Sequence, residues 1–233
     1  MAVTPPTSPT HTLFCPGRPD SLVEAVYRWV LDDPRIAVEP VGGHEAVLAR
    51  FTGAHPDGRT RSGRAAGVVD RDAYPEATLA RQAEVVHVLP YFETESYLCH
   101  PALLGPTLAQ LGRPRSAEAL WAELVSSARA TYVPAVNAHL SNSPKPTGRA
   151  RLEAMAAQYA EQLAAADAVL EGDDVDALLR YFPGRRLADR VARQLDFLSP
   201  QHLLECARAA VRPAEVAPLA RLRADLRGRM SLP

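Results

Sequence analysis

Several features that would assign the chain to a common class are missing. The three cysteines, Cys15, Cys99 and Cys206, are far apart and form no CxxC pair or Cys/His cluster, so the sequence predicts neither a zinc site nor a disulfide framework. No apolar run approaches the ~20 residues that span a bilayer. The first ten residues, MAVTPPTSPT, lack the basic start and apolar segment of a signal peptide. No GxxxxGK[ST] motif for nucleoside triphosphates is present. We therefore expect a cytoplasmic protein.

Charge is nearly balanced over the whole chain but not along it. The net charge is −1, yet the segment from Arg180 onward holds eleven arginines against five acidic residues. A basic segment beside an acidic one is compatible with a polyanionic partner, because nucleic-acid binding depends on contacts with phosphates. The alternative is a set of solvated helix faces, and the composition leaves both interpretations open.

Short apolar runs alternate with helical patterns through about residue 98. This alternation predicts a small parallel sheet flanked by helices, an α/β fold of Rossmann-like type. In such sheets, ligands bind at the carboxyl ends of the strands. The expected strands are 11–15, 35–41, 65–70 and 84–92, and the expected helices between them are 21–31, 44–51 and 76–82.

The pattern becomes helical throughout the remainder of the chain. We predict a disordered tail over 1–10, an α/β domain over 11–105 and an all-helical C-terminal lobe over 106–233. One predicted helix carries the stripe Leu152, Met155, Tyr159, Leu163, Ala166 and Leu170, which is typical of a core-facing side. The expected helices are 116–140, 149–170, 175–182, 184–195, 200–211 and 213–230.

Two carboxylates end the third predicted strand. Asp70 and Asp72 are separated by one residue, so in an extended chain they point to the same side. Mg²⁺ prefers oxygen ligands and accepts one or two protein carboxylates together with water or substrate phosphates. The pair therefore predicts a divalent-metal site, although Asp72 could instead cap the helix that follows.

The order of four motifs resembles the Toprim (topoisomerase–primase) fold. These motifs are LFCPGRPDSLVEAVYRWVL, VEPVGGHEAV, AAGVVDRD and VLPYFETESYL, and YFPGRRLADRVARQL is similar to a Pro-Gly-Lys element in the helical part of one branch. That branch contains nucleases of the overcoming-lysogenization-defect (OLD) kind and small proteins that accompany ABC-type ATPases in antiphage defence. The resemblance covers residues 11–105.

The resemblance implies an activity and a set of site residues. Asp70 and Asp72 match the metal-binding DxD, Glu95 matches an acidic residue after the fourth strand, and Asp20 matches the acid that opens the first helix. The implied cofactor is Mg²⁺ or Mn²⁺, and the implied reaction is phosphodiester hydrolysis of DNA or RNA. The implied partners are nucleic acid and an ABC- or AAA-type ATPase; a homodimer is left open.

One position departs from the family pattern. The first strand normally ends in Glu-Gly, and that glutamate is a metal ligand often assigned general acid/base work, whereas this chain has Pro16-Gly17. Proline has no ionisable group, so it cannot transfer a proton. Either Asp20 joins Asp70, Asp72 and Glu95 in the site, or the protein has lost catalysis and binds an ATPase or nucleic acid as a sensor or regulator.

Four further side chains are candidates for phosphate contacts. Arg185 and Arg186 follow Pro-Gly at the start of a predicted helix, and the guanidinium group suits phosphate. His44 follows Gly42-Gly43 at a strand end, and Lys145 lies in a loop rich in turn residues. Each has an ordinary structural alternative, such as helix capping for His44 and simple solvation for Lys145.

Overall fold

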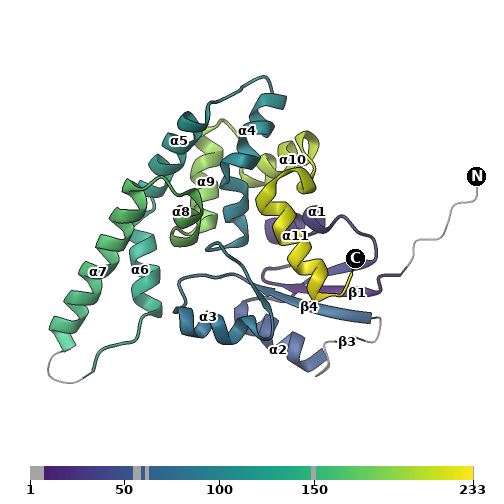
Figure 1. The fold of residues 1–233 in the computed structure, drawn as a ribbon, viewed down its shortest axis with the longest axis horizontal. Helices are drawn as coiled ribbons and strands as arrows, with labels where there is room; N and C mark the ends of the chain where they lie inside the picture. The colour runs from purple at the N-terminus through teal and green to yellow at the C-terminus, as the bar shows by residue number, and fades with distance from the viewer. Residues whose placement is uncertain (1–7, 55–58, 61–62, 148–150, 233) are drawn as a thin grey trace, which may run out of the picture. The chain divides into compact units, whose positions relative to one another are not determined.

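A parallel sheet forms the N-terminal part of the protein in the computed structural model, which describes residues 8–54, 59–60, 63–147 and 151–232. Its strands run in the order β2-β1-β4-β5, with every neighbouring pair parallel. They are β1 (His11–Cys15), β2 (Ile36–Pro40), β4 (Gly63–Val69) and β5 (His87–Val88) (Figure 1). The predicted fold class, a parallel sheet with helices followed by a helical region, is therefore confirmed.

The chain divides into two compact units. The first unit comprises residues 1–70, 81–89 and 212–233, and the second comprises 71–80 and 90–211. This division differs from the boundary expected after residue 105 in two ways: residues 71–80 and 90–105 belong to the second unit, and the last helix of the chain belongs with the sheet. Of the tail predicted over 1–10, residues 1–7 lie outside the described residues.

The first helix begins and ends where local chemistry predicts. Helix α1 (Leu22–Leu31) is capped by Ser21, whose hydroxyl accepts a hydrogen bond of 3.3 Å from the Glu24 N–H. The Glu24 carboxylate in turn accepts the N–H of Asp20 at 2.7 Å and pairs with Arg28 at 2.6 Å. The helix ends at Asp32, which adopts a left-handed conformation.

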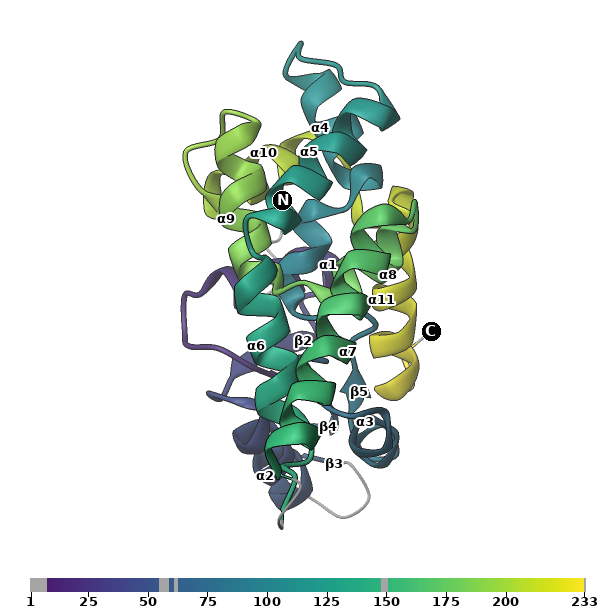
Figure 2. The same cartoon turned by 90° about the vertical axis from the view of Figure 1, so that its left-hand side faces the viewer.

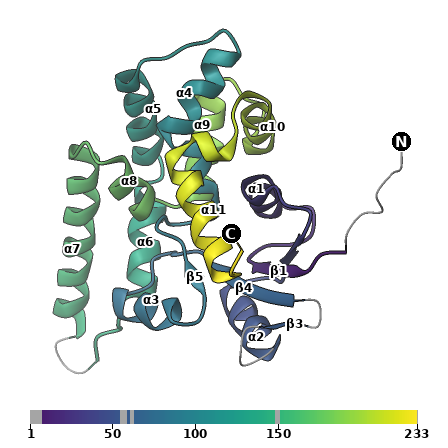
Figure 3. The same ribbon diagram turned by 45° about the vertical axis from the view of Figure 1, so that its right-hand side comes forward.

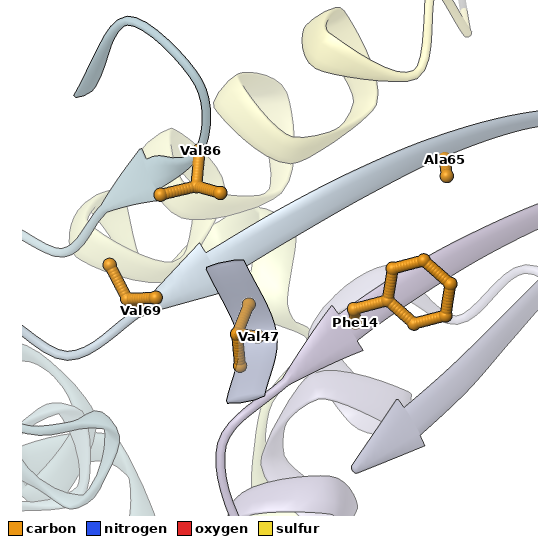
Figure 4. Close-up of a cluster of buried hydrophobic side chains, with 5 residues drawn as sticks. All are labelled: Phe14, Val47, Ala65, Val69 and Val86. Carbon is orange, nitrogen blue, oxygen red and sulfur yellow. The ribbon is translucent and has the colours of Figure 1, made fainter. Parts of the chain in front are cut away.

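Apolar residues from several segments form the core of the first unit. Phe14 on β1, Ala65 and Val69 on β4, Val47 on helix α2 (His44–Ala54) and Val86 beside β5 are all buried together (Figure 4). Every residue from Ala65 to Val69 is buried, as the continuous apolar run predicted. The central strand is thus covered on both faces, which fixes the position of its carboxyl end.

The C-terminal helix belongs to the sheet unit. Helix α11 (Ala217–Arg229) packs on α1, β4 and β5 (Figure 3). Its Leu219, Leu222 and Leu226 are buried. Arg227 at its end donates a hydrogen bond of 3.0 Å to the Asp33 carboxylate after α1. The sequence predicted this helix but placed it in the helical lobe.

Helices make up nearly all of the second unit. Adjacent helices α6 and α7 lie side by side (Figure 2), and the 3₁₀ helix η1 packs against α9. The elements are η1 (Thr94–Cys99), α4 (Pro101–Gln110), α5 (Ala117–Arg129), α6 (Tyr132–Asn142), α7 (Arg151–Glu171), α8 (Val175–Tyr181), α9 (Gly184–Gln194) and α10 (Pro200–Ala210). Helix α3 (Glu76–Ala83) and the short 3₁₀ helix η2 (Pro213–Glu215) complete the helical elements described.

Proline explains two differences from the expected elements. The helix predicted over 116–140 is broken at Ala130–Thr131, because Pro134 has no N–H to continue the helix across that point. The strand predicted over 84–92 shortens to His87–Val88, and Pro90 follows it closely. A further short strand, β3 (Arg59–Thr60), pairs antiparallel with the start of β4.

The stripe predicted along α7 is buried only at its C-terminal end. Ala166 and Leu170 are buried, but Leu152 is 81% exposed and Met155 and Tyr159 are nearly half exposed. The prediction of a core-facing stripe is wrong for the first half of α7. Among the described residues, we find no helix long and apolar enough to cross a membrane.

Candidate functional site

Two glycines form a bridge at the carboxyl ends of β1 and β2. Gly17 and Gly42 exchange backbone hydrogen bonds of 2.7 and 2.9 Å, and both have φ +107°, a conformation that favours glycine. A Cβ atom at Gly17 would also lie 2.9 Å from the Ser21 hydroxyl. The glycine bridge therefore joins the chain just after β1 to the chain just after β2, and Pro16 stands immediately before it.

Three predicted site residues belong to the first unit. Asp70 directly follows β4. Burial, then the charge of Glu24 and then that of Asp70, raise the pKa of the Cys15 thiol to about 12. The thiol is therefore protonated at neutral pH and is not a nucleophile. Asp20 is exposed before α1, with its backbone N–H held by Glu24. His44 begins α2, where burial lowers its pKa.

Asp72 belongs to the second unit. It adopts a left-handed backbone conformation (φ 47°), and its N–H donates a hydrogen bond of 2.7 Å to the Phe92 carbonyl. Burial and the charge of Glu93 raise the pKa of the Asp72 carboxyl to about 6. The intervening Arg71 forms an ion pair with Glu76 on α3.

Glu93 occupies the start of helix α9. Its carboxylate accepts the backbone N–H of Arg185 at 2.6 Å and also interacts with the N–H of Gly184. Free amides at a helix N-terminus favour a carboxylate. Burial nevertheless outweighs these amides and the nearby charges of Arg185 and Arg186, so the pKa of Glu93 is raised.

Glycine is required where α9 meets η1. A Cβ atom at Gly184 would lie 2.7 Å from the backbone nitrogen of Ser96 and still closer to the Ser96 hydroxyl. This close approach brings the start of α9 against the segment that carries Glu93 and Glu95. The Pro-Gly pair noted in the sequence therefore has a definite packing role.

Glu95 lies on η1 and is only 7% exposed. Burial, with repulsion from Glu93 and Asp189, raises the pKa of its carboxyl to about 7. The Cys99 thiol is fully buried, and this burial, together with the charge of Glu95, raises the pKa of the thiol. A carboxyl that titrates near neutrality is suited to proton transfer, and such shifts are frequent at functional sites.

Glu93 interacts electrostatically with both Asp72 and Glu95 in the second unit. Glu93 raises the pKa of both Asp72 and Glu95. The sequence assigned the metal role to Glu95 and gave none to Glu93; the one sequence signal related to Glu93 is the Pro-Gly start of the helix that its carboxylate caps. We refer to Asp72, Glu93 and Glu95 as the carboxylate group.

The carboxylate group offers the oxygen donors that Mg²⁺ prefers. Within the described ranges, no three or more His, Cys, Asp or Glu side chains are close enough to surround one ion. Mg²⁺ commonly uses only one or two protein carboxylates, and a cation would relieve the repulsion between Asp72 and Glu93. By donor chemistry alone, Asp72 and Glu93 suit Mg²⁺ as two of its ligands.

The predicted phosphate-contact residues differ in their surroundings. Arg185 and Arg186 are exposed at the start of α9, next to Glu93, and Arg190 and Arg193 are exposed further along the same helix. Lys145 is exposed and lines a separate pocket of about 560 Å³ with Met155 and Tyr159. Arg185 and Arg186 are thus the arginines of α9 whose charges act on Glu93.

The chain was compared with protein-family models, with curated proteins and with solved structures, and none of the three comparisons finds a match. The sheet and its flanking helices are consistent with a Rossmann-like or Toprim-like α/β domain.

Proposed function

We propose that the protein is a Toprim-like, metal-dependent nuclease that hydrolyses phosphodiesters of DNA or RNA. The observation that carries the proposal is the carboxylate group beside the exposed arginines that begin α9: burial raises the pKa of all three side chains, and the charge of Glu93 adds to the shift in Asp72 and Glu95. Burying acids that repel one another costs folding free energy. Proteins that keep such acids frequently use them to bind a cation or to transfer a proton. The resemblance of the sequence to nucleases of the OLD kind agrees with this chemistry.

Each residue in the group has a distinct role in this proposal. Asp72 and Glu93 would hold Mg²⁺. Asp70 is added as a metal ligand only because the sequence resemblance implies it. When bound, the ion supplies Lewis-acid polarisation of the phosphate and activation of water. Glu95, with a pKa of about 7, holds or releases a proton near neutral pH. Arg185 and Arg186 bind backbone phosphates through their guanidinium groups.

The direct test is cleavage of single-stranded and duplex DNA and of RNA with Mg²⁺ or Mn²⁺. We expect wild-type cleavage to be lost in Asp72→Asn and in the double variant Asp70→Ala/Asp72→Ala. The matched control is Asp173→Asn, an exposed carboxylate outside the group, which should cleave like the wild type. Cleavage that survives both substitutions at the DxD pair would overturn the proposal.

Pro16 favours a second function. Because the usual glutamate at the end of the first strand is replaced, the alternative is a catalytically inactive Toprim-like subunit that binds an ABC-type ATPase or nucleic acid in antiphage defence. In that case the wild type does not cleave, Pro16→Glu gains metal-dependent cleavage, and the wild type co-elutes with an ABC-type ATPase encoded beside its gene. Robust wild-type cleavage would reject this alternative.

A further inference from the structure

A cleft beside Asp72 lies wholly within the second unit. Its volume is about 420 Å³, and it is bordered by the segment 71–76, the end of α6, and residues of α7 and α8. Figure 2 shows the three helices that contribute to it. Pockets of about 300–1,000 Å³ bind small ligands, so the cleft has room for one nucleotide unit. We call it the Asp72 cleft.

An aromatic pair lines the Asp72 cleft. The rings of His139 and Tyr181 are stacked, with centroids 4.1 Å apart and planes inclined by 19°. The His139 ring is held by a 3.0 Å hydrogen bond between Nε2 and the Tyr181 carbonyl; because a carbonyl only accepts, Nε2 carries the hydrogen. The Tyr181 hydroxyl donates to the Gln162 carbonyl at 2.8 Å. These contacts hold the two rings in place in the lining of the cleft.

The polar residues of the cleft suit a base and a phosphate together. Asn142 and Gln162 place amide groups in the lining, which can donate to and accept from the edge of a base. The exposed guanidinium of Arg180 lies in the same lining, and its Nε makes a 3.4 Å contact with the Pro90 carbonyl. Burial lowers the pKa of His139, so its ring is neutral and can pack against a base without a desolvated charge.

We propose that the Asp72 cleft binds an unpaired nucleotide of a nucleic-acid single strand. The base packs against the aromatic pair and its phosphate contacts Arg180. A base within a duplex is paired and stacked, so it would have to be extruded before it entered such a cleft. This inference rests on the proposed function and refines it: the substrate class is single-stranded nucleic acid or a frayed strand end.

The test measures binding without catalysis. A fluorescein-labelled single-stranded DNA hexamer is titrated with the protein in EDTA, and adenosine monophosphate and a DNA duplex closed by hairpins at both ends serve as competitors. We expect the single strand to bind and the monophosphate to compete, with the closed duplex at least about ten-fold weaker than the single strand. Equal binding of the closed duplex would overturn the proposal.

Matched variants locate the binding in the cleft. Arg180→Gln and Asn142→Ala should each weaken binding of the hexamer by about five-fold or more. The controls Arg129→Gln at the end of α5 and Asn137→Ala on the outer side of α6 are exposed and lie outside the cleft lining, so they should bind like the wild type. Circular dichroism checks that each variant is folded. Equal losses in variants and controls, or no loss in any, would overturn the assignment.

The inference and the proposed function fail separately. Saturable binding that depends on Arg180, with no cleavage in Mg²⁺ or Mn²⁺, would support the proposed nucleotide cleft and rule out the proposed nuclease activity. Cleavage that depends on Asp72 but is indifferent to Arg180 and Asn142, with no competition by the monophosphate, retains the nuclease and rejects the nucleotide cleft.

Discussion

The carboxylate of Glu93 accepts a 2.6 Å hydrogen bond from the backbone N–H of Arg185, a residue 92 positions further along the chain. This contact joins the segment before η1 to the first turn of α9. The carboxylate pairs with backbone N–H groups that have no hydrogen-bond partner within the helix. It also places an acidic group beside Arg185 and Arg186. One side chain therefore contributes both to packing within the second unit and to the charge of the candidate site.

Glu93→Ala should destabilise the protein because α9 loses its N-terminal carboxylate. Loss of a helix-capping side chain costs about 1–2 kcal/mol of unfolding free energy, which urea denaturation can measure. Glu205→Ala, an exposed glutamate on α10, is the matched control and should change that free energy by less than about 0.5 kcal/mol. A loss no greater than the control would show that the capping contact contributes little.

Gly184→Ala should be strongly destabilising, since the added methyl group meets the Ser96 backbone nitrogen at 2.7 Å. Overpacking against backbone costs about 1–3 kcal/mol. In Gly228→Ala on α11 the added Cβ has nothing within 4 Å, so helix propensity should stabilise that variant by up to about 1 kcal/mol. Thermal unfolding of both variants tests the contrast, and similar effects of the two changes would contradict it.

Asp33 should make part of the stability depend on acid pH. Hydrogen bonds from Arg35 and then from Arg227 hold the pKa of its carboxyl below the ordinary value of 3.8. The unfolded chain therefore binds this proton more readily, so the contribution of Asp33 is present above pH 3.8 and is lost as the pH falls through the folded value.

Asp33→Asn measures that contribution. Arg35 is partly exposed, so solvent screens its interaction with Asp33. With that allowance, we expect the unfolding free energy to fall by about 1–2 kcal/mol at pH 7. The difference between variant and wild type should shrink in urea denaturation below about pH 3.5. A difference that stays constant between pH 7 and pH 3 would argue against the ionic contribution.

Mg²⁺ should stabilise the protein if Asp72 and Glu93 bind it. A ligand that binds only the folded state raises the melting temperature, and we expect about 2–4 °C at about 10 mM MgCl₂. Asp72→Asn should abolish the increase, whereas Asp173→Asn should keep it. Differential scanning fluorimetry provides the measurement, and an equal increase in both variants would place Mg²⁺ elsewhere.

The two halves of α7 should respond differently to substitution. Leu152 is 81% exposed, so Leu152→Gln should change the unfolding free energy by less than about 0.5 kcal/mol. Leu170 is 8% exposed, and Leu170→Ala should cost about 2–4 kcal/mol because it leaves a cavity. Chemical denaturation of the two variants tests the assignment; equal losses would mean that the first half of α7 is also packed.

Local patterns were sufficient to predict the sheet and most helices. The apolar run before Asp70 marks a strand covered on both faces, and Ser21 followed by Glu24 marks the start of α1. These features depend on neighbours in the sequence, so periodicity and capping chemistry reveal them. Pro134 and Pro90 were visible as well, but their effect in shortening a helix and a strand was not anticipated.

Long-range packing could not be predicted in the same way. The return of α11 to the sheet depends on which apolar surface remains uncovered, and nothing local to Leu219 or Leu222 specifies it. The exposed start of α7 has the same periodicity as a buried stripe. Likewise, the role of Glu93 depends on a helix that begins more than ninety residues later. Asp70, Asp72 and Glu95 as metal ligands stay a prediction.

The contacts of α11 also constrain the order in which the protein can fold during synthesis. The ribosome releases the strands first and α11 only after the whole of the second unit, so this helix, with its buried Leu219, Leu222 and Leu226, reaches α1, β4 and β5 last. Until then the sheet presents an uncovered apolar surface to the cell. A nascent chain arrested before residue 212 would therefore be a natural client for chaperones, even though every strand of its sheet had already been made.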